Sequence, residues 1–405
     1  MFLQFHNWHF DVKRQRVRDQ KGLWITSFFR QLGFALINVF SIVFVFELGR
    51  NYFLGGGVEN GLAFLISYFL VLFGTVAVFC IWIANHIISR VGYRKSILLS
   101  LGLTSIGFLS LAFADIYQSL AFIYLAAFFK GLGVCHYWVT YYTLFTDDIK
   151  TQTIGSSFGA LDAFAKLGQI VAPLIGAALT VVFGYKALFL IGIVFLFLSG
   201  LPMFFLKHHL HLDNVSWKEL WQWSKEARFR RLSLSLGGRA VQEKLLAIIW
   251  PVYVFLLIGT IEGMGFFQSM VLLSSAVFTY IISRFFDKHS SRWLQVVGVF
   301  GNIGMWFSRI FVGSLSQVIL VDSGDRFFES LSRTFFFGYL FRRAKGKESF
   351  SFVVYWIFWD AFWLVLLLSL LLAVLFTFGL EIFWLIMVLL ASAGASLSLL
   401  IQDHK

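Results

Sequence analysis

Long apolar runs separated by short polar segments restrict the fold of this sequence more than any other feature. Twelve such runs can be marked along the 405 residues, and each is about as long as the roughly 20 residues that a helix needs to cross a bilayer. They leave no room for a soluble catalytic domain. We therefore predict an all-α membrane protein with 12 transmembrane helices. The predicted spans are 24–48, 60–86, 96–114, 117–145, 154–182, 186–206, 233–258, 262–283, 293–313, 316–340, 352–377 and 381–401.

The composition supports a bilayer as the surroundings of this chain. Hydrophobic residues make up 59% of it and charged residues 13%, which is more apolar surface than a water-soluble domain can bury. A net charge of +12 would suggest a nucleic-acid partner if the basic residues covered a soluble face. They lie instead in short segments between apolar runs, so we expect lipid contacts and no nucleic acid.

The distribution of Lys and Arg predicts the orientation. With the N-terminus inside, the segments outside hold only Arg50 and Lys186, as expected if basic residues resist translocation. The run 316–340 carries five charged residues, yet it must cross, because otherwise the basic segments 284–292 and 341–347 would fall on opposite sides. We expect a multi-pass protein of the inner or plasma membrane with both termini cytoplasmic.

The longest polar stretch lies near the middle of the chain. It mixes Trp217, Trp221 and Trp223 with basic residues, which is typical of an amphipathic helix at a membrane interface. The predicted organisation is an N-terminal six-helix bundle at 1–206, a cytoplasmic linker at 207–231 and a C-terminal six-helix bundle at 232–405.

A basic loop occurs once in each half, as SRVGYRK at 89–95 and SRFFDKHSSR at 283–292. These loops resemble the signature of the major facilitator superfamily, G-x-x-x-D-R-x-G-R-K, which has a weaker second copy. The resemblance implies two pseudo-symmetric six-helix bundles, a substrate site between them near mid-membrane, and a monomer. The residues that match the cytoplasmic gating motif are Arg90, Gly92, Arg94, Asp287 and Lys288.

Both copies depart from the family pattern. The first has Asn85 in place of the Gly and Ser89 in place of the Asp, and the second has Ser290 in place of a Gly. Gating by the usual Asp of the first half is therefore not expected.

Two further stretches bear on transport direction and coupling. Residues 168–177 are similar to the G-P-x-x-G-G stretch of exporters in this superfamily, although close packing of small residues explains them equally. In the fourth run, Ala127 and Lys130 replace the Arg and Gln that proton-coupled drug antiporters carry. This weighs against a standard drug/proton exchanger.

Charged residues within the runs are the best sequence pointers to a site, because each costs on the order of 2.5–3.5 kcal/mol at mid-bilayer. Asp162 and Lys166 lie four apart on one helix face, as a static ion pair, a gated pair or a substrate contact. Asp322, Arg326, Glu329 and Arg333 form a stripe of alternating sign, which is either a self-neutralised ladder or a substrate or proton path.

The remaining candidates are aromatic, titratable or isolated. Tyr137 and Tyr141 accompany Lys130 in the fourth run and suggest a cavity lining, although aromatic belts and helix packing explain most membrane tyrosines. His136 is a candidate for titration near neutral pH, although a lone histidine is more often a packing residue. Asp360 has no charged partner in its own run and is a candidate for proton coupling.

We therefore predict a secondary active transporter that moves a small solute by alternating access, coupled to a proton gradient and with export favoured. No nucleotide or cofactor fingerprint or hydrolase motif occurs, so we expect no enzyme, no cofactor and no metal. The alternatives are a polytopic membrane enzyme acting on lipid-linked substrate, with its charges at one interface, and a transporter-like scaffold that moves nothing.

Overall fold

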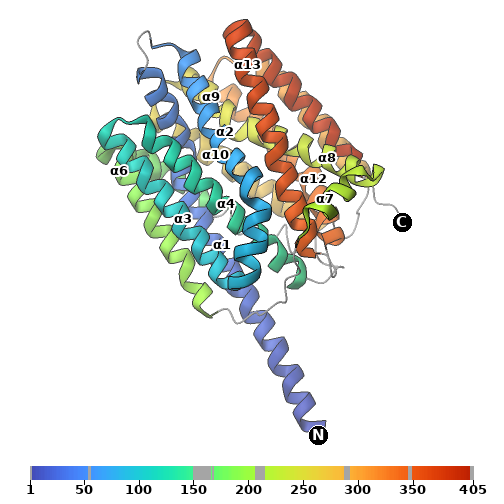
Figure 1. Ribbon diagram of the computed structural model, residues 1–405. Helices are drawn as coiled ribbons and strands as arrows, with labels where there is room; N and C mark the ends of the chain where they lie inside the picture. Colours follow the sequence, from blue (N-terminus) through green and yellow to red (C-terminus); the bar gives the residue numbers. More distant parts are fainter. Residues whose placement is uncertain are drawn as a thin grey trace.

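The structure is a computed structural model that describes residues 2–52, 56–148, 166, 168–205, 215–286, 292–344 and 349–401, and every regular element in those ranges is helical (Figure 1). The first helix begins well outside the body of the molecule and then enters it (Figure 1). The predicted all-α class is therefore confirmed, and long apolar stretches explain it, since a chain in lipid must satisfy its backbone bonds internally.

The helices of the first half pack mainly against one another. Helix α3 contacts α4 and α6, and α1 contacts α2 and α6. A single turn of π-helix, Ala84–Ile88, joins α2 to α3, and a 3₁₀ turn, Leu201–Phe205, follows α6. The helices are α1 (Phe2–Tyr52), α2 (Val58–Ile83), α3 (Ser89–Tyr117), α4 (Leu120–Asp148) and α6 (Ala172–Gly200).

The helices of the second half also pack on one another. Helix α13 packs on α8 and α11, and α12 packs on α10 and α11. The helices are α7 (Trp217–Lys225), α8 (Ala227–Lys244), α9 (Trp250–Ile258), α10 (Ile261–Phe286), α11 (Arg292–Ser308), α12 (Leu315–Ala344) and α13 (Ser349–Leu397). Contacts of α2 and α4 with α13, and of α6 with α10, join the two halves.

Three helices are broken by a glycine with positive φ. Gly92 in α3, Gly184 in α6 and Gly379 in α13 have φ of 79°, 79° and 75°, with ψ near 180°. A side chain at this combination of angles is strained, and only glycine adopts it readily. The helix axis changes direction at each glycine, as the two arms of α13 show in Figure 1.

Seven helical stretches among the described residues are long and apolar enough to cross a membrane. Two of them, Val58–Tyr117 and Ser349–Leu400, have 60 and 52 residues, and each contains one of the glycines at which a helix is broken. Helices α11 and α12 are not among the seven; α12 carries its charges within the apolar run. The seven are Trp24–Tyr52, Val58–Tyr117, Leu120–Thr146, Ala172–Phe205, Ala227–Ile258, Ile261–Ile282 and Ser349–Leu400.

Small residues set the helix spacing at two crossings, one in each half. A Cβ added to Gly131 of α4 would lie 2.6 Å from the Leu72 carbonyl oxygen of α2. In the second half Gly238 of α8 meets Gly394 of α13, where an added Cβ would lie 2.5 Å from a carbonyl oxygen. Such close backbone approach is how helices associate in lipid, where hydrophobicity alone does not drive them together.

Candidate functional site

The acidic residues nearest the N-terminus of α12 are buried inside the second half. The guanidinium of Arg309 lies 2.7 Å from Asp322 Oδ1 and 3.2 Å from Asp325 Oδ2, and all three side chains are buried. Asp322 also accepts a bond from Trp250 Nε1, and Asp325 accepts one from Asn302 Nδ2, both at 2.9 Å. With each carboxylate held by Arg309 and by one further donor, this cluster is a structural unit.

The charged residues further along α12 form ion pairs with α8. Arg239 of α8 lies 2.7 Å from Glu243 and 3.3 Å from Glu329 of α12, and Glu329 lies 2.5 Å from Arg326. Arg333 approaches Glu243 to 3.9 Å. Among the described residues, three guanidinium groups thus share two carboxylates.

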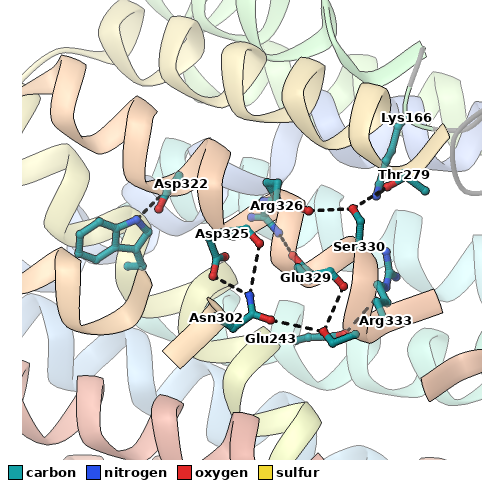
Figure 2. Close-up of polar contacts among 12 residues, drawn as sticks. Lys166, Glu243, Thr279, Asn302, Asp322, Asp325, Arg326, Glu329, Ser330 and Arg333 are labelled. Atoms are coloured by element: carbon teal, nitrogen blue, oxygen red, sulfur yellow. Dashed lines mark hydrogen bonds and ion pairs between the residues drawn. The ribbon is translucent and has the colours of Figure 1, made fainter. Parts of the chain in front are cut away.

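A lysine from the first half reaches this network (Figure 2). Lys166 Nζ donates to Thr279 Oγ1 of α10 at 3.0 Å, Thr279 contacts Ser330 of α12 at 3.2 Å, and Ser330 bonds the Arg326 carbonyl at 2.7 Å. Lys166 is also within electrostatic range of Glu329. The contact therefore couples the relative position of the two halves to the charges on α12.

On the first-half side, a buried arginine sits among aromatic rings. The Arg30 guanidinium of α1 lies 3.6 Å from the ring centre of Tyr137, 4.4 Å from Phe34 and 5.3 Å from Trp138. Among the residues that the structure describes, no carboxylate pairs with Arg30. A buried cation whose described contacts are rings and hydroxyls is a ready binding group for an anion.

Aromatic residues of the two halves meet beside this arginine. Tyr137 stacks on Tyr141 with ring centres 5.2 Å apart. One residue further along α4, Tyr142 stacks on Trp356 of α13 at 4.6 Å, with the rings 5° from parallel. Phe145 packs on Phe341 of α12 at 4.7 Å. This contact closes the interface at the end where α4 and α12 finish and α13 begins.

Two predicted site residues lie inside the first half. Lys130 is buried 5.0 Å from the ring centre of Phe108 on α3 and 5.6 Å from that of Tyr68 on α2. His136 is buried against α3, where Ser96 Oγ lies 3.1 Å from its Nδ1. Neither contacts Arg30 or the network on α8 and α12 in the described contacts, so the structure does not bring them together with the other candidates.

Asp360 lies at the edge of the interface. Its carboxylate accepts a bond from Trp356 Nε1 at 2.9 Å, and its electrostatic neighbours are Glu243 and Lys244 of α8. Within the described part of the chain it forms no ion pair. Tyr142 is within electrostatic range of the same Asp360 and Glu243 and of Arg333, so the rings and the charges form one connected region.

The gating motif is described in its first copy only. Arg90 is exposed, Gly92 makes the break in α3, and the Arg94 guanidinium lies 5.3 Å from the ring centre of Phe204 after α6. A Cβ on Gly92 would meet open space, so its φ alone demands glycine. The predicted residues Asp162, Asp287 and Lys288 lie outside the described residues.

Asn85 explains one departure from the family pattern. Its side chain donates to the Val215 carbonyl and accepts from the Val215 N–H, both at 2.6 Å. Ser89 in turn donates to the Asn85 carbonyl. The paired bonds anchor the chain just before α7, an amphipathic helix with Trp217 and Trp221 exposed and Leu220 buried. A glycine at position 85 would lack them.

Sequence reasoning missed Arg30 and Arg309. Each is a lone arginine within or at the end of an apolar run, which is the same signal that identified Asp360. Arg30 was overlooked because it lies soon after the basic N-terminal segment, and Arg309 because its acidic partners are on a different helix.

The comparisons with known proteins fit this arrangement. The sequence profile described as Major Facilitator Superfamily matches residues 23–401. The chain belongs to the Major Facilitator Superfamily. A crystal structure of a variant of the E. coli fucose:proton symporter superposes with a TM-score of 0.64 at 12% identity, over 95% of this chain and 100% of that chain. No curated protein matches the sequence.

Membership confirms the predicted family. As a Major Facilitator Superfamily transporter, the chain is a multi-pass membrane protein whose substrate is a small-molecule solute. The likeness to the fucose symporter shows the fold alone, because identity is low. What the interface of this chain binds must therefore be argued from its own residues.

Proposed function

We propose that this chain is a secondary active transporter that moves a small organic anion by alternating access, coupled to protons. Arg30 carries the proposal: it is a buried cation on α1 at the interface of the halves, ringed by Tyr137 and Trp138 and paired with no described carboxylate. A carboxylate or phosphate of a substrate would pair with this guanidinium, since guanidinium groups bind both through paired hydrogen bonds.

The charges on the opposite side support the same substrate class. Arg239, Arg326 and Arg333 lie on this side, and Lys166 approaches from the first half. An anion between the halves would be attracted by these four cations. The pair between Arg239 and Glu329 joins α8 to α12, while the other two close pairs each lie within one helix, so both carboxylates keep a partner when the halves rock.

Asp360 is the proposed proton carrier. Its carboxylate has a single described hydrogen bond, from Trp356, whose ring also stacks on Tyr142 across the interface. Movement of α13 against α4 therefore changes the surroundings of Asp360. A carboxyl group that is more solvated in one state than in the other takes up a proton on one side and releases it on the other.

We infer that the described helices form twelve spans in two six-helix bundles. Val58–Tyr117 would extend about 90 Å as one helix, roughly three times the hydrocarbon core. Turning back at Gly92, Gly184 and Gly379 divides three of the seven stretches in two, and α11 and α12 complete the twelve. The basic segments then share one side, which we take as cytoplasmic, with both termini there and the chain in the inner or plasma membrane.

The test is uptake in proteoliposomes with a panel of organic anions, cations and neutral solutes and an imposed pH gradient. An anion should be moved, and Arg30→Gln should raise its KM at least tenfold, while Arg50→Gln at the far end of the same helix leaves the KM unchanged. Asp360→Asn should retain exchange of solute but lose accumulation driven by the pH gradient. Its matched control is Glu381→Gln, an exposed carboxylate on the other arm of α13.

Each contrary result has a definite meaning. Movement of cations or neutral solutes alone would refute the anion proposal, and proton-driven accumulation by Asp360→Asn would refute the role of that carboxyl. Flux of no solute in the panel would favour the scaffold, or the enzyme on lipid-linked substrate. Comparing inside-out with right-side-out vesicles tests the predicted direction of transport, which is export. The small residues Gly176 and Ala177 are no evidence for export, because their packing against α1 and α10 already explains their size.

A further inference from the structure

Two hollows on the second half lie along one side of α8. The first is an apolar groove of about 220 Å³ between α8 and the two arms of α13. The second is a hollow of about 250 Å³ at the start of α8, lined by the ends of α12 and α13. Neither touches the charged network between the halves, so the proposed transport site does not account for them.

The helix that they share joins the two hollows. Ala227 and Arg231 line the second hollow, and Leu234, Gly238 and Val241 line the groove. Their spacing of four, three, four and three places all five on one face of α8. The end of α13 continues in the same direction, with residue 397 in the groove and residues 400 and 401 in the hollow. One continuous surface therefore runs from a polar end to an apolar one.

The polar end is strongly basic. Arg228, Arg231 and Arg343 line it, and among the described residues that line it none is acidic. Among the described residues none of the three forms an ion pair, and Arg343 is held 5.0 Å from the ring centre of Phe229. The hollow also lies at the N-terminus of α8, whose capping residue makes no side-chain bond. Guanidinium groups and a helix N-terminus both favour a phosphate.

The other end is apolar, because the described residues that line it are Gly, Ala, Val, Leu and Trp. Gly237, Gly238 and Gly394 form its floor, and the exposed side chains of Leu366 and Leu370 form a rim, 46% and 47% accessible. In a membrane protein such a groove faces acyl chains. Its basic end lies at the depth where the headgroups of the nearer leaflet lie, because α8 begins just after the interfacial helix α7.

We propose that this surface binds an anionic diacyl phospholipid, with the phosphate among Arg228, Arg231 and Arg343 and one acyl chain along the groove of α8 and α13. A basic pocket between membrane helices with an adjoining apolar groove meets both halves of such a molecule. A zwitterionic phospholipid fits the groove but adds a cation beside three arginines. A free phosphate ester fits the hollow but leaves the groove unused.

The experiment is native mass spectrometry of the full chain, delipidated and then equilibrated with equal phosphatidylglycerol and phosphatidylcholine of the same acyl chains. The wild type should retain phosphatidylglycerol at least tenfold over phosphatidylcholine. Each of Arg228→Gln, Arg231→Gln and Arg343→Gln should reduce that retention about fivefold. Arg230→Gln is the control, because Arg230 is an exposed neighbour on α8 that does not line the hollow.

Two further arms separate the headgroup from the chain. Leu234→Trp, which fills the groove at its junction with the hollow, should reduce retention about tenfold while the thermal unfolding midpoint stays unchanged. Glycerol phosphate in millimolar excess should not displace the lipid. Equal retention of both lipids, equal losses in Arg230→Gln and in the hollow variants, or displacement by glycerol phosphate would each overturn the proposal.

Discussion

Replacing Arg309 with methionine should destabilise the second half severely. The guanidinium is the only described cation in contact with Asp322 and Asp325, at 2.7 and 3.2 Å, and all three side chains are at most 2% exposed. Removing one partner of a buried ion pair typically costs about 3–5 kcal/mol. The bonds from Trp250 and Asn302 remain, which favours the lower end of this range, about 3 kcal/mol. That is roughly a hundredfold change in the unfolding equilibrium.

The assay is reversible unfolding in mixed detergent micelles, followed by tryptophan fluorescence. Adding Asp322→Asn and Asp325→Asn to Arg309→Met should restore most of the loss, because neutral amides still accept the bonds from Trp250 and Asn302. Arg292→Gln, an exposed arginine at the start of α11, is the control. Wild-type stability of Arg309→Met, or no recovery in the triple variant, would refute the reasoning that uncompensated charge is the cause.

Three other predictions concern packing and the linker. Trp356→Ala removes a ring stack worth about 0.5–1.5 kcal/mol. Distances between spin labels should show that the ratio of states with α4 and α13 apart to states with them together rises roughly two- to tenfold, and unchanged distances would contradict this. Gly176→Ala should cost about 1–3 kcal/mol of unfolding free energy, since its Cβ would meet the Leu36 carbonyl at 2.4 Å. Gly74→Ala, with open space around it, should be neutral or stabilising. Asn85→Ala loses two bonds worth about 1 kcal/mol each, so amide exchange before α7 should accelerate at least fivefold, and equal exchange would exclude an anchoring role.

The length and spacing of the apolar runs predicted the helical class and the membrane location, and the paired basic loops predicted the family. These are local properties, because a helix in lipid satisfies its backbone within itself wherever it sits in the bundle. The same applies to the amphipathic helix α7, whose three tryptophans among basic residues were visible in the sequence.

The pairing of the charges was not visible. Asp322 and Glu329 share one stripe of α12, yet Asp322 binds Arg309 while Glu329 binds Arg239, which is 90 residues away in the chain. Lys130 and Tyr137 share α4, but they are seven residues or about 10 Å apart along the axis, so one meets α2 and α3 while the other meets Arg30 of α1. Helical periodicity tells which residues share a face. Only the close packing of helices, set by small residues such as Gly131 and Gly238, decides which face of which neighbour they meet.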